Sequence, residues 1–206
     1  MKRKEKILEI ALQMFNERGV SEVGVREIAR ALSISVGNLS YHFPKKEDII
    51  LALVNRLSSQ NSQHYQHYHL QPASLNHFLQ LLANIFSNQF DHRGILIGNA
   101  ELKHIYSTIF DYQITLQKRV QGFELIYQNL QKANHLTLSE ADLQHLISLT
   151  TLYARFWLHE AFIDHVSMSK NSLIEKYMKV WSYQLSIFAT EEGKASLGEY
   201  WENVHE

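Results

Sequence analysis

A short run of small and polar residues in the first quarter of the chain carries side chains suited to hydrogen bonds with nucleic acid. The run comprises Ser35, Val36, Gly37, Asn38, Ser40, Tyr41, His42 and Lys46. Small side chains allow close approach to the major groove, and an amide such as that of Asn38 can pair bidentately with adenine. Tyr41, His42 and Lys46 can donate to phosphate, Lys46 together with the N-terminal amides of a following helix. The pattern therefore predicts base contacts flanked by phosphate contacts.

Three helices are expected to position this run. Apolar residues recur on one helical face over residues 4–18, and a second, short helix is expected over 25–32. Ser35 is a good N-cap for a third helix over 36–42. Two short helices joined by a tight turn form a helix-turn-helix arrangement.

The residues next to the polar run anchor and end the third helix. Leu39 and Phe43 are the expected buried anchors, and Pro44 stops the helix because proline cannot continue the backbone hydrogen bonds. A fourth helix is expected from about residue 47 to 57 or beyond, with two carboxylates favourably placed in its first turn.

The rest of the chain predicts further helices, with Gly94 and Gly98 breaking one region. Their expected ranges are 75–86, 102–133, 140–165 and 171–189. The last two are apolar almost all round, so each needs neighbours on every side. We therefore expect a homodimer interface on these two helices, with the contributing side chains Trp157, Tyr177, Trp181 and Phe188.

Composition and length agree with an all-α fold. The 206 residues hold 45% hydrophobic residues, only 2 prolines and 8 glycines, and no cysteine. The absence of cysteine excludes disulfides, thiolate catalysis and cysteine-ligated zinc. No uncharged apolar stretch of about 18 residues exists, so we expect no membrane association and a cytoplasmic location.

Charge is distributed unevenly along the chain. Residues 1–56 hold 10 Lys and Arg against 7 Asp and Glu, whereas the remainder holds 10 against 14. A polyanion would therefore meet the N-terminal part.

Residues 26–49, REIARALSISVGNLSYHFPKKEDI, resemble the DNA-binding domain of the tetracycline-repressor (TetR) family. The match covers about residues 5–57 and combines the Ile-Ala of the second helix, the Tyr-His-Phe at the end of the third and the Lys-Glu that follows. The resemblance implies a helix-turn-helix DNA-binding domain over 1–56 and a larger helical effector-binding and dimerisation domain over 57–206. It also adds Arg26, at the start of the second helix, to the DNA contacts.

The resemblance further implies a one-component regulator rather than an enzyme. The expected function is a homodimeric repressor that a small-molecule effector releases from a palindromic double-stranded DNA operator. Two positions depart from the family pattern. Ser33 stands where glycine is usual, so a left-handed backbone there costs about 1 kcal/mol. Ser40 replaces a common tyrosine, which changes the contact but keeps it polar.

The effector contacts are less defined by the sequence. Arg155 and His159 share a narrow polar stripe with Ser148 and Thr151 on an otherwise apolar helix. A buried arginine needs a partner, which could be a ligand acid group, a carboxylate across the dimer interface, or solvent. The candidate effector-binding residues are Phe123, Tyr127, Arg155, Phe156 and His159.

Three alternatives compete with this interpretation. His64, His67 and His69 could suggest a metal site, but no carboxylate accompanies them, so no metal or cofactor is expected. Glu101 and His104 form a single Glu-x-x-His, whereas di-iron bundles need two, which disfavours an enzyme. A third possibility keeps DNA binding but makes the C-terminal domain a protein-binding module without an effector.

The last segment, 191–206, predicts one more helix with an apolar face. Leu197, Tyr200, Trp201 and Val204 recur at helical spacing. A helix this short is marginal in water, so it is expected to dock against the helical domain or a partner subunit rather than to form a frayed end.

Overall fold

The computed structural model of the protein describes residues 3–97, 112–164 and 168–205. Every regular element within these ranges is a helix, and an isolated bridge pairs Leu136 with Ala189. The expected all-α class is confirmed. No described helix is both long enough and apolar enough to cross a bilayer. The chain divides into two compact units, unit 1 with residues 1–61 and 88–112, and unit 2 with residues 62–87 and 113–206.

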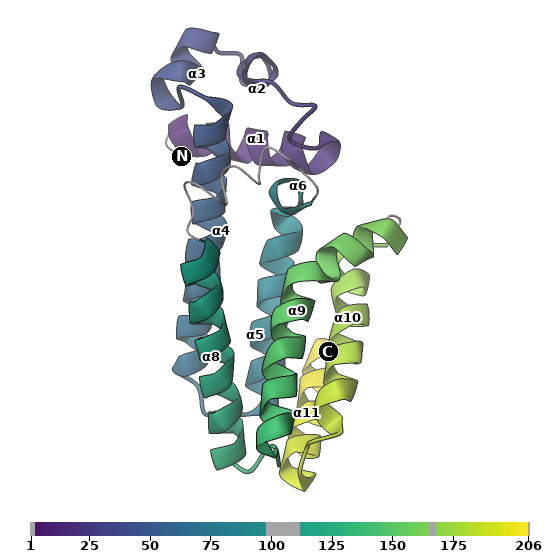
Figure 1. The fold of residues 1–206 in the computed structure, drawn as a ribbon. Coiled ribbons are helices and arrows are strands. Elements are labelled where there is room, and N and C mark those ends of the chain that lie inside the picture. The colour runs from purple at the N-terminus through teal and green to yellow at the C-terminus, as the bar shows by residue number, and fades with distance from the viewer. Residues whose placement is uncertain (1–2, 98–111, 165–167, 206) are drawn as a thin grey trace. The chain divides into compact units, whose positions relative to one another are not determined.

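Unit 1 contains the N-terminal helices (Figure 1). They are α1 (Arg3–Arg18), α2 (Val25–Ala31), α3 (Val36–His42), the first part of α4 (Lys46–His69), the end of α5 (Leu75–Asp91) and α6 (Arg93–Leu96). The predicted ranges of the first three helices agree with these to within a residue. Unit 1 therefore includes the segment after α5 in addition to the predicted helix-turn-helix.

The core of unit 1 is built from apolar side chains of all these helices except α5. Its members include Ile7, Phe15, Ile28, Leu39, Phe43, Ile49, Leu53 and Ile95. Each such side chain contributes about 1.5–3 kcal/mol when it leaves water. Leu39 and Phe43 are buried, as predicted, and they fix α3 to this core.

Gly94 brings α6 against α1 instead of simply breaking the helical pattern. A Cβ at this position would overlap the Phe15 carbonyl group, so only glycine permits the approach. The Asn16 side chain secures the contact, accepting a bond from Gly94 N and donating one to Asp91 O, both at 2.7 Å. Gly98 lies outside the described residues.

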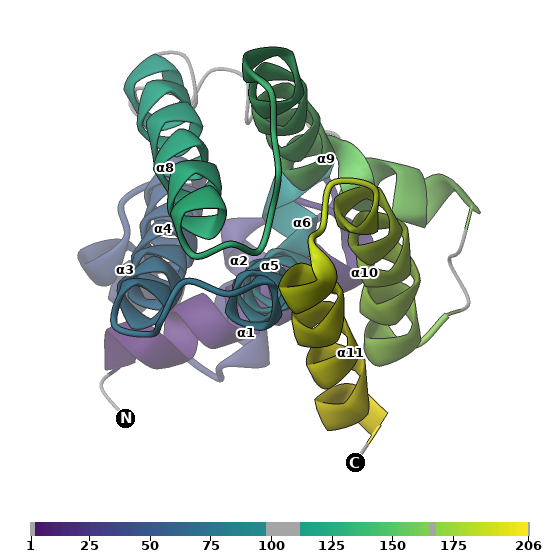
Figure 2. The ribbon, with the colours of Figure 1, turned by 90° about the horizontal axis from the view of Figure 1, so that it is seen from below.

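Unit 2 contains the longer C-terminal helices, which Figure 2 shows from below. They are α8 (Tyr112–Lys132), α9 (Glu140–Asp164), α10 (Lys170–Ser186) and α11 (Glu191–His205), together with the end of α4 and most of α5. Residues 102–111 of the helix expected over 102–133 lie outside the described ranges.

Aromatic rings form a continuous cluster in the core of unit 2. Phe86 of α5 stacks on Trp157 of α9 with ring centroids 4.6 Å apart, and Tyr153 stacks on Trp181 of α10 at 5.4 Å. Tyr177 meets both Tyr153 and Trp157 edge-on. These contacts tie three helices together inside one chain.

The C-terminal segment is a helix that docks on its own chain, one of the two docking partners expected from the sequence. Leu197 and Tyr200 of α11 are buried, and the Trp201 indole donates to the Ser182 hydroxyl of α10 at 3.0 Å. Figure 2 shows α10 and α11 side by side. Gly193 approaches the His135 carbonyl so closely that a Cβ would overlap its oxygen. The tail is therefore part of the core of unit 2.

Candidate nucleic-acid interface

The turn between α2 and α3 is set by a left-handed residue. Ser33 has φ +53°, and the amides of Ser33 and Ile34 donate to the carbonyls of Arg30 and Ala29, both at 3.0 Å. This pair of bonds is the Schellman arrangement that ends a helix. The left-handed conformation expected at Ser33 is confirmed. It ends α2 and turns the chain before α3 begins.

A carboxylate fixes the start of α2. Glu27 accepts from the Gly24 amide at 2.9 Å and from the Arg18 guanidinium at 2.8 Å. The amide bond, followed by the Arg18 bond, lowers the pKa of Glu27 below its ordinary value of 4.5. The guanidinium also bonds the Glu22 carbonyl at 2.7 Å, so α1 and α2 are held at a defined angle.

The N-terminal turn of α3 presents the residues predicted to reach bases. The Ser35 hydroxyl accepts from the Asn38 amide at 3.1 Å, which caps the helix and uses Ser35 as a structural residue. Ser35, Val36, Gly37 and Asn38 are exposed, and Ser40 is half-buried. The structure thus brings the predicted base-reading side chains together on the outer side of α3, opposite Leu39.

The C-terminal turn of α3 exposes an aromatic donor. Tyr41 is 85% exposed, a large value for an aromatic residue, while His42 is half-buried and meets the Tyr41 ring edge-on at 5.2 Å. Arg26 on α2 is also exposed.

The start of α4 differs from the expected phosphate clamp in its details. The Lys46 ammonium donates to the Val20 carbonyl at 3.0 Å and is half-buried, so it also ties α4 to the loop after α1. Asp48 accepts from the Lys45 amide at 2.9 Å, so that amide is already satisfied. Lys45 itself is exposed at the same helix start. The sequence interpretation overlooked Lys45, although its place directly after Pro44 was a usable signal.

The five candidate effector residues do not come together. Phe123 and Tyr127 of α8 are buried in the core of unit 2, and the Tyr127 hydroxyl pairs with Thr150 at 2.6 Å. Arg155 and Phe156 are exposed on α9, and Arg155 lies over the Phe156 ring at 5.7 Å. His159 is half-buried, with a buried Nδ1 that has no hydrogen-bond partner among the described residues. The Arg155 side chain reaches the surface of the chain, so solvent, one of the three partners considered for it, is accessible to it.

Most of the predicted dimerisation side chains lie inside the chain. Trp157, Tyr177 and Trp181 are buried in the aromatic cluster of unit 2, and Phe188 is half-buried. Three of the four residues therefore cannot form a subunit interface. The sequence pattern correctly showed that α9 and α10 are apolar on more than one side but could not tell which side faces inward.

The outward sides of α9 and α10 carry exposed apolar residues. This set, which we call the α9–α10 face, comprises Leu152, Phe156, Ile163, Val180, Tyr183 and Ile187. Val180, Tyr183 and Ile187 recur at i, i+3 and i+7, which is one helical stripe. That spacing was available in the sequence as a second apolar stripe on each helix.

The residues of the metal and enzyme alternatives contribute no cluster in the described ranges. There, no group of three or more His, Asp or Glu side chains is placed to hold a metal ion. Partial burial, followed by the nearby charge of His67, lowers the pKa of His64. Glu101 and His104 lie outside the described residues.

Known proteins resemble the chain over its whole length. Residues 7–53 match the model of the bacterial regulatory proteins of the tetR family. A probable HTH-type transcriptional regulator of Bacillus subtilis, YttP, is 31% identical over 183 residues, covering 79% of this chain and 81% of its own. The crystal structure of a TetR-family regulator from Marinobacter aquaeolei has the same fold, with a TM-score of 0.80, 21% identity and 99% coverage of both chains. SmeT, solved as a complex with triclosan, has a TM-score of 0.66 at 15% identity and covers 91% of this chain and 92% of its own.

Proposed function

The chain belongs to the TetR family of transcriptional regulators, and from this we propose that it is a homodimeric repressor released from a palindromic operator by a small molecule. It is a DNA-binding regulator with a helix-turn-helix and is not an enzyme. Dimerisation, the operator, repression and the effector belong to the proposal. Because such a regulator acts on the chromosome, its proposed place of action is the cytoplasm.

The observation that carries the DNA-binding proposal is the exposed outer side of α3. Val36, Gly37 and Asn38 are exposed at its first turn while Leu39 is fully buried, so the helix is anchored by one side and free on the other. A recognition helix needs this arrangement, since its N-terminal residues must meet base edges. Tyr41 at the other end supplies an exposed donor for phosphate.

Phosphate contacts from α2 and α4 complete the proposed footprint. Arg26 and Lys45 are exposed, and the half-buried Lys46, whose ammonium donates to the Val20 carbonyl, lies at the start of α4 next to Lys45. His42, half-buried beside Tyr41, is proposed for a phosphate oxygen, and Ser40 for the groove wall. We assign Ser35 mainly to capping α3, because its hydroxyl accepts from the main-chain amide of Asn38.

We assign the subunit contact to the α9–α10 face. Six large apolar side chains along α9 and α10 are exposed, and large exposed apolar surfaces mark interaction sites. A two-fold axis beside these helices would cover the same side chains on both subunits. The partner is a second copy of this chain. A dimer carries two helix-turn-helix units related by two-fold symmetry, so its operator should be a palindrome whose half-sites repeat that symmetry.

The effector proposal rests on unit 2. SmeT, which has the same fold, was solved as a complex with triclosan, and this supports a small-molecule effector for the chain. An effector lowers operator affinity only if it binds the released conformation more tightly than the DNA-binding one. The candidates with apolar surroundings are Phe123 and Tyr127, and the orphaned Nδ1 of His159 is the polar atom that a ligand could satisfy.

Selection of bound sequences from a random DNA pool tests the proposal. Enrichment of a palindrome is expected, with Asn38→Ala relaxing specificity at one base pair per half-site by about 1–3 kcal/mol. Lys45→Ala should weaken operator and random DNA alike and reduce the salt slope by about one per lost contact. Lys118→Ala, at an exposed position of α8, is the control. Unchanged specificity in Asn38→Ala would show that α3 does not read the bases.

A further inference from the structure

A buried histidine lies at the junction of α5 and α6 in unit 1. His92 follows the last residue of α5 and is the N-cap residue of α6, and its side chain is 2% exposed. Its Nδ1 lies 2.9 Å from the Asn88 carbonyl oxygen, which can only accept, so Nδ1 carries the proton and donates. The neutral ring therefore has an unprotonated Nε2, which is buried and has no hydrogen-bond partner among the described residues.

Asn88, the residue that accepts from the imidazole, is itself held in place by α4. Its side-chain amide donates to the Leu57 carbonyl at 3.1 Å and to the Asn61 side-chain oxygen at 2.7 Å. Asn61 and Asn88 are both buried. The contact between α4 and α5 therefore fixes the imidazole through Nδ1 and keeps Nε2 enclosed.

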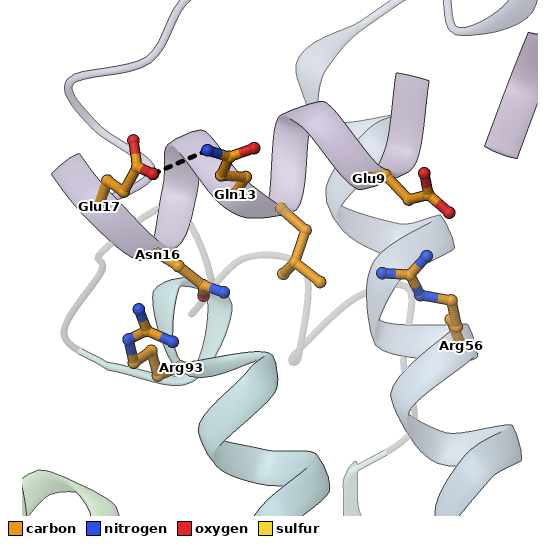
Figure 3. Close-up of a pocket in the computed structure, with 7 residues that line it drawn as sticks. Glu9, Gln13, Asn16, Glu17, Arg56 and Arg93 are labelled. Atoms are coloured by element: carbon orange, nitrogen blue, oxygen red, sulfur yellow. Dashed lines mark hydrogen bonds between the residues drawn. The ribbon is translucent and has the colours of Figure 1, made fainter. Parts of the chain in front are cut away.

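The charged groups around His92 come from four helices. Arg56 of α4, Arg93 of α6 and Glu17 of α1 line one pocket of unit 1 (Figure 3). The Arg56 cation acts against an imidazolium at His92, and the Asp91 carboxylate of α5 acts in its favour. The charges of Asp91 and Glu17 also act on Arg93. Burial has the largest effect and lowers the pKa of His92 below its ordinary value of 6.5, aided by Arg56 and opposed by the main-chain hydrogen bond and Asp91.

The residues on both sides of His92 are fastened to α1. The Asn16 side chain donates to the Asp91 carbonyl and accepts from the Gly94 amide, both at 2.7 Å. Figure 3 shows Asn16 between α1 and the start of α6. Gly94 also lies so close to the Phe15 carbonyl group that a side chain does not fit there. Because α1 packs against α2 as well, a movement of α6 would displace a helix on which the helix-turn-helix rests.

We propose that His92 is a pH switch for the contact between α6 and α1, closed when the ring is neutral and open when it is protonated. In the closed form, a proton on Nε2 would have no acceptor, and the imidazolium would face the Arg56 cation. Opening the junction relieves both costs, because Nε2 then meets water.

The sign of the pH effect follows from the two protonation equilibria. The open form takes up its proton near pH 6.5, whereas the closed form takes it up only at lower pH. The closed form is therefore favoured above pH 6.5 and loses this advantage as the pH falls below that value. The regulatory consequence is weaker operator binding at acidic pH, and this part rests on the proposed function.

Hydrogen exchange of the Gly94 amide measures the switch without DNA, because this amide donates to Asn16 only in the closed form. Between about pH 7.5 and pH 5.5 its protection factor should fall about three- to tenfold, the upper value being the limit for uptake of one proton by an open-form histidine of ordinary pKa. The Gly193 amide of unit 2, which donates to the Thr190 hydroxyl at 3.1 Å, is the matched control and should change less than about twofold. An unchanged or rising Gly94 protection factor would overturn the switch.

Substitution of the histidine assigns the effect to His92. His92→Asn keeps a donor for the Asn88 carbonyl but cannot be protonated, so its Gly94 protection factor should change less than about twofold over the same range. His92→Gln takes its place if the first variant fails to fold. His145→Gln, at an exposed position of α9, should keep the wild-type response. A full response in the variants that lack His92 would show that another group opens the junction.

An NMR titration measures the protonation of His92 directly. Its ring signals, assigned by their loss in the His92 variants, should give a pKa below 6.5. Arg56→Gln should raise this pKa, because it removes the facing cation. A wild-type pKa at or above 6.5 would contradict the closed form described above, and an unchanged pKa in Arg56→Gln would remove Arg56 from the switch.

Operator affinity tests the regulatory part separately. On the operator obtained by selection, the wild type should lose at least about threefold more affinity than His92→Asn between the same two pH values. Both proteins carry the same proposed DNA contacts, so the difference comes from His92. Equal losses would overturn the regulatory role. Failure to select any operator would overturn the proposed function instead, and it would leave the Gly94 exchange result standing.

Discussion

Single residues in left-handed or capping positions set the geometry of the helix-turn-helix in unit 1. Ser33 ends α2 at φ +53°, and Glu27 fixes its start through the Gly24 amide and Arg18. Asn134 ends α8 in the same way at φ +61°, with the His135 amide donating to Leu130 O at 2.9 Å. Asparagine tolerates this region better than serine, so the strain is concentrated at Ser33.

Ser33→Gly should stabilise the protein by about 0.5–1 kcal/mol, because glycine relieves the left-handed strain but brings additional chain entropy. Urea denaturation measures this gain in the free energy of unfolding, and the m-value should stay that of the wild type. The matched control is Gly19→Ala at φ +84°, where no atom lies within 4 Å of the added Cβ, so only the backbone is tested. It should lose about 1 kcal/mol. A neutral or destabilising Ser33→Gly would contradict the strain at this turn.

The lowered pKa of Glu27 predicts that the stability of unit 1 depends on pH in the acidic range. Since the folded-state pKa lies below 4.5, the stabilisation by Glu27 is complete above that pH and is lost as the pH falls through the folded value. Glu27→Gln should therefore be less stable at neutral pH, and its stability should decline less steeply on acidification. Thermal melting between about pH 3 and pH 7 measures both effects. Glu22→Gln should keep the wild-type profile, because only its main-chain carbonyl meets Arg18.

Among the elements, α11 is the one whose role depends most on close backbone contact. Its Gly193 packs on the turn after α8, where the Thr190 amide donates to the His135 carbonyl at 3.2 Å. Leu197, Tyr200 and Trp201 then run along α10. Burial of the first two contributes about 1.5–3 kcal/mol each.

Gly193→Ala should destabilise unit 2 by about 1–3 kcal/mol, because its Cβ would overlap the His135 carbonyl oxygen and move α11. Gly198→Ala, on the same helix with open space around it, is the control. It should gain up to about 1 kcal/mol from the better helix propensity of alanine. Chemical denaturation compares the two variants. Equal stability would mean that α11 does not depend on this contact.

At the scale of the whole molecule, the chain has two compact units and an apolar surface without a described partner. The α9–α10 face lies on unit 2, whereas the recognition helix lies on unit 1. Residues buried in the aromatic cluster of unit 2 and residues on that face alternate along the same two helices. Substitutions in the two sets therefore test different properties.

Tyr183→Glu combined with Ile187→Glu should produce a folded monomer, because both side chains are largely exposed and a charge on each would be buried twice at a two-fold interface. Sedimentation velocity measures the association, and circular dichroism confirms folding. Leu70→Glu, also largely exposed in unit 2, should leave the dimer intact. Trp181→Glu, in contrast, should unfold unit 2. A charged double variant that remains dimeric would place the interface elsewhere.

The sequence by itself determined the local elements of this protein. The helix ranges of α1 to α3 and the anchors Leu39 and Phe43 follow from periodicity and capping, which depend on residues a few positions apart. The left-handed turn at Ser33 was expected only from the resemblance to the TetR family. Only the tertiary structure decided which side of α9 and α10 faces inward, and it buried Trp181 while exposing Tyr183. An all-round apolar helix gives no signal of direction, because burial depends on the neighbours that distant segments provide. A pocket of unit 1 is likewise lined by Glu9, Arg56 and Arg93, residues far apart in sequence that are brought together only when α1, α4 and α6 pack.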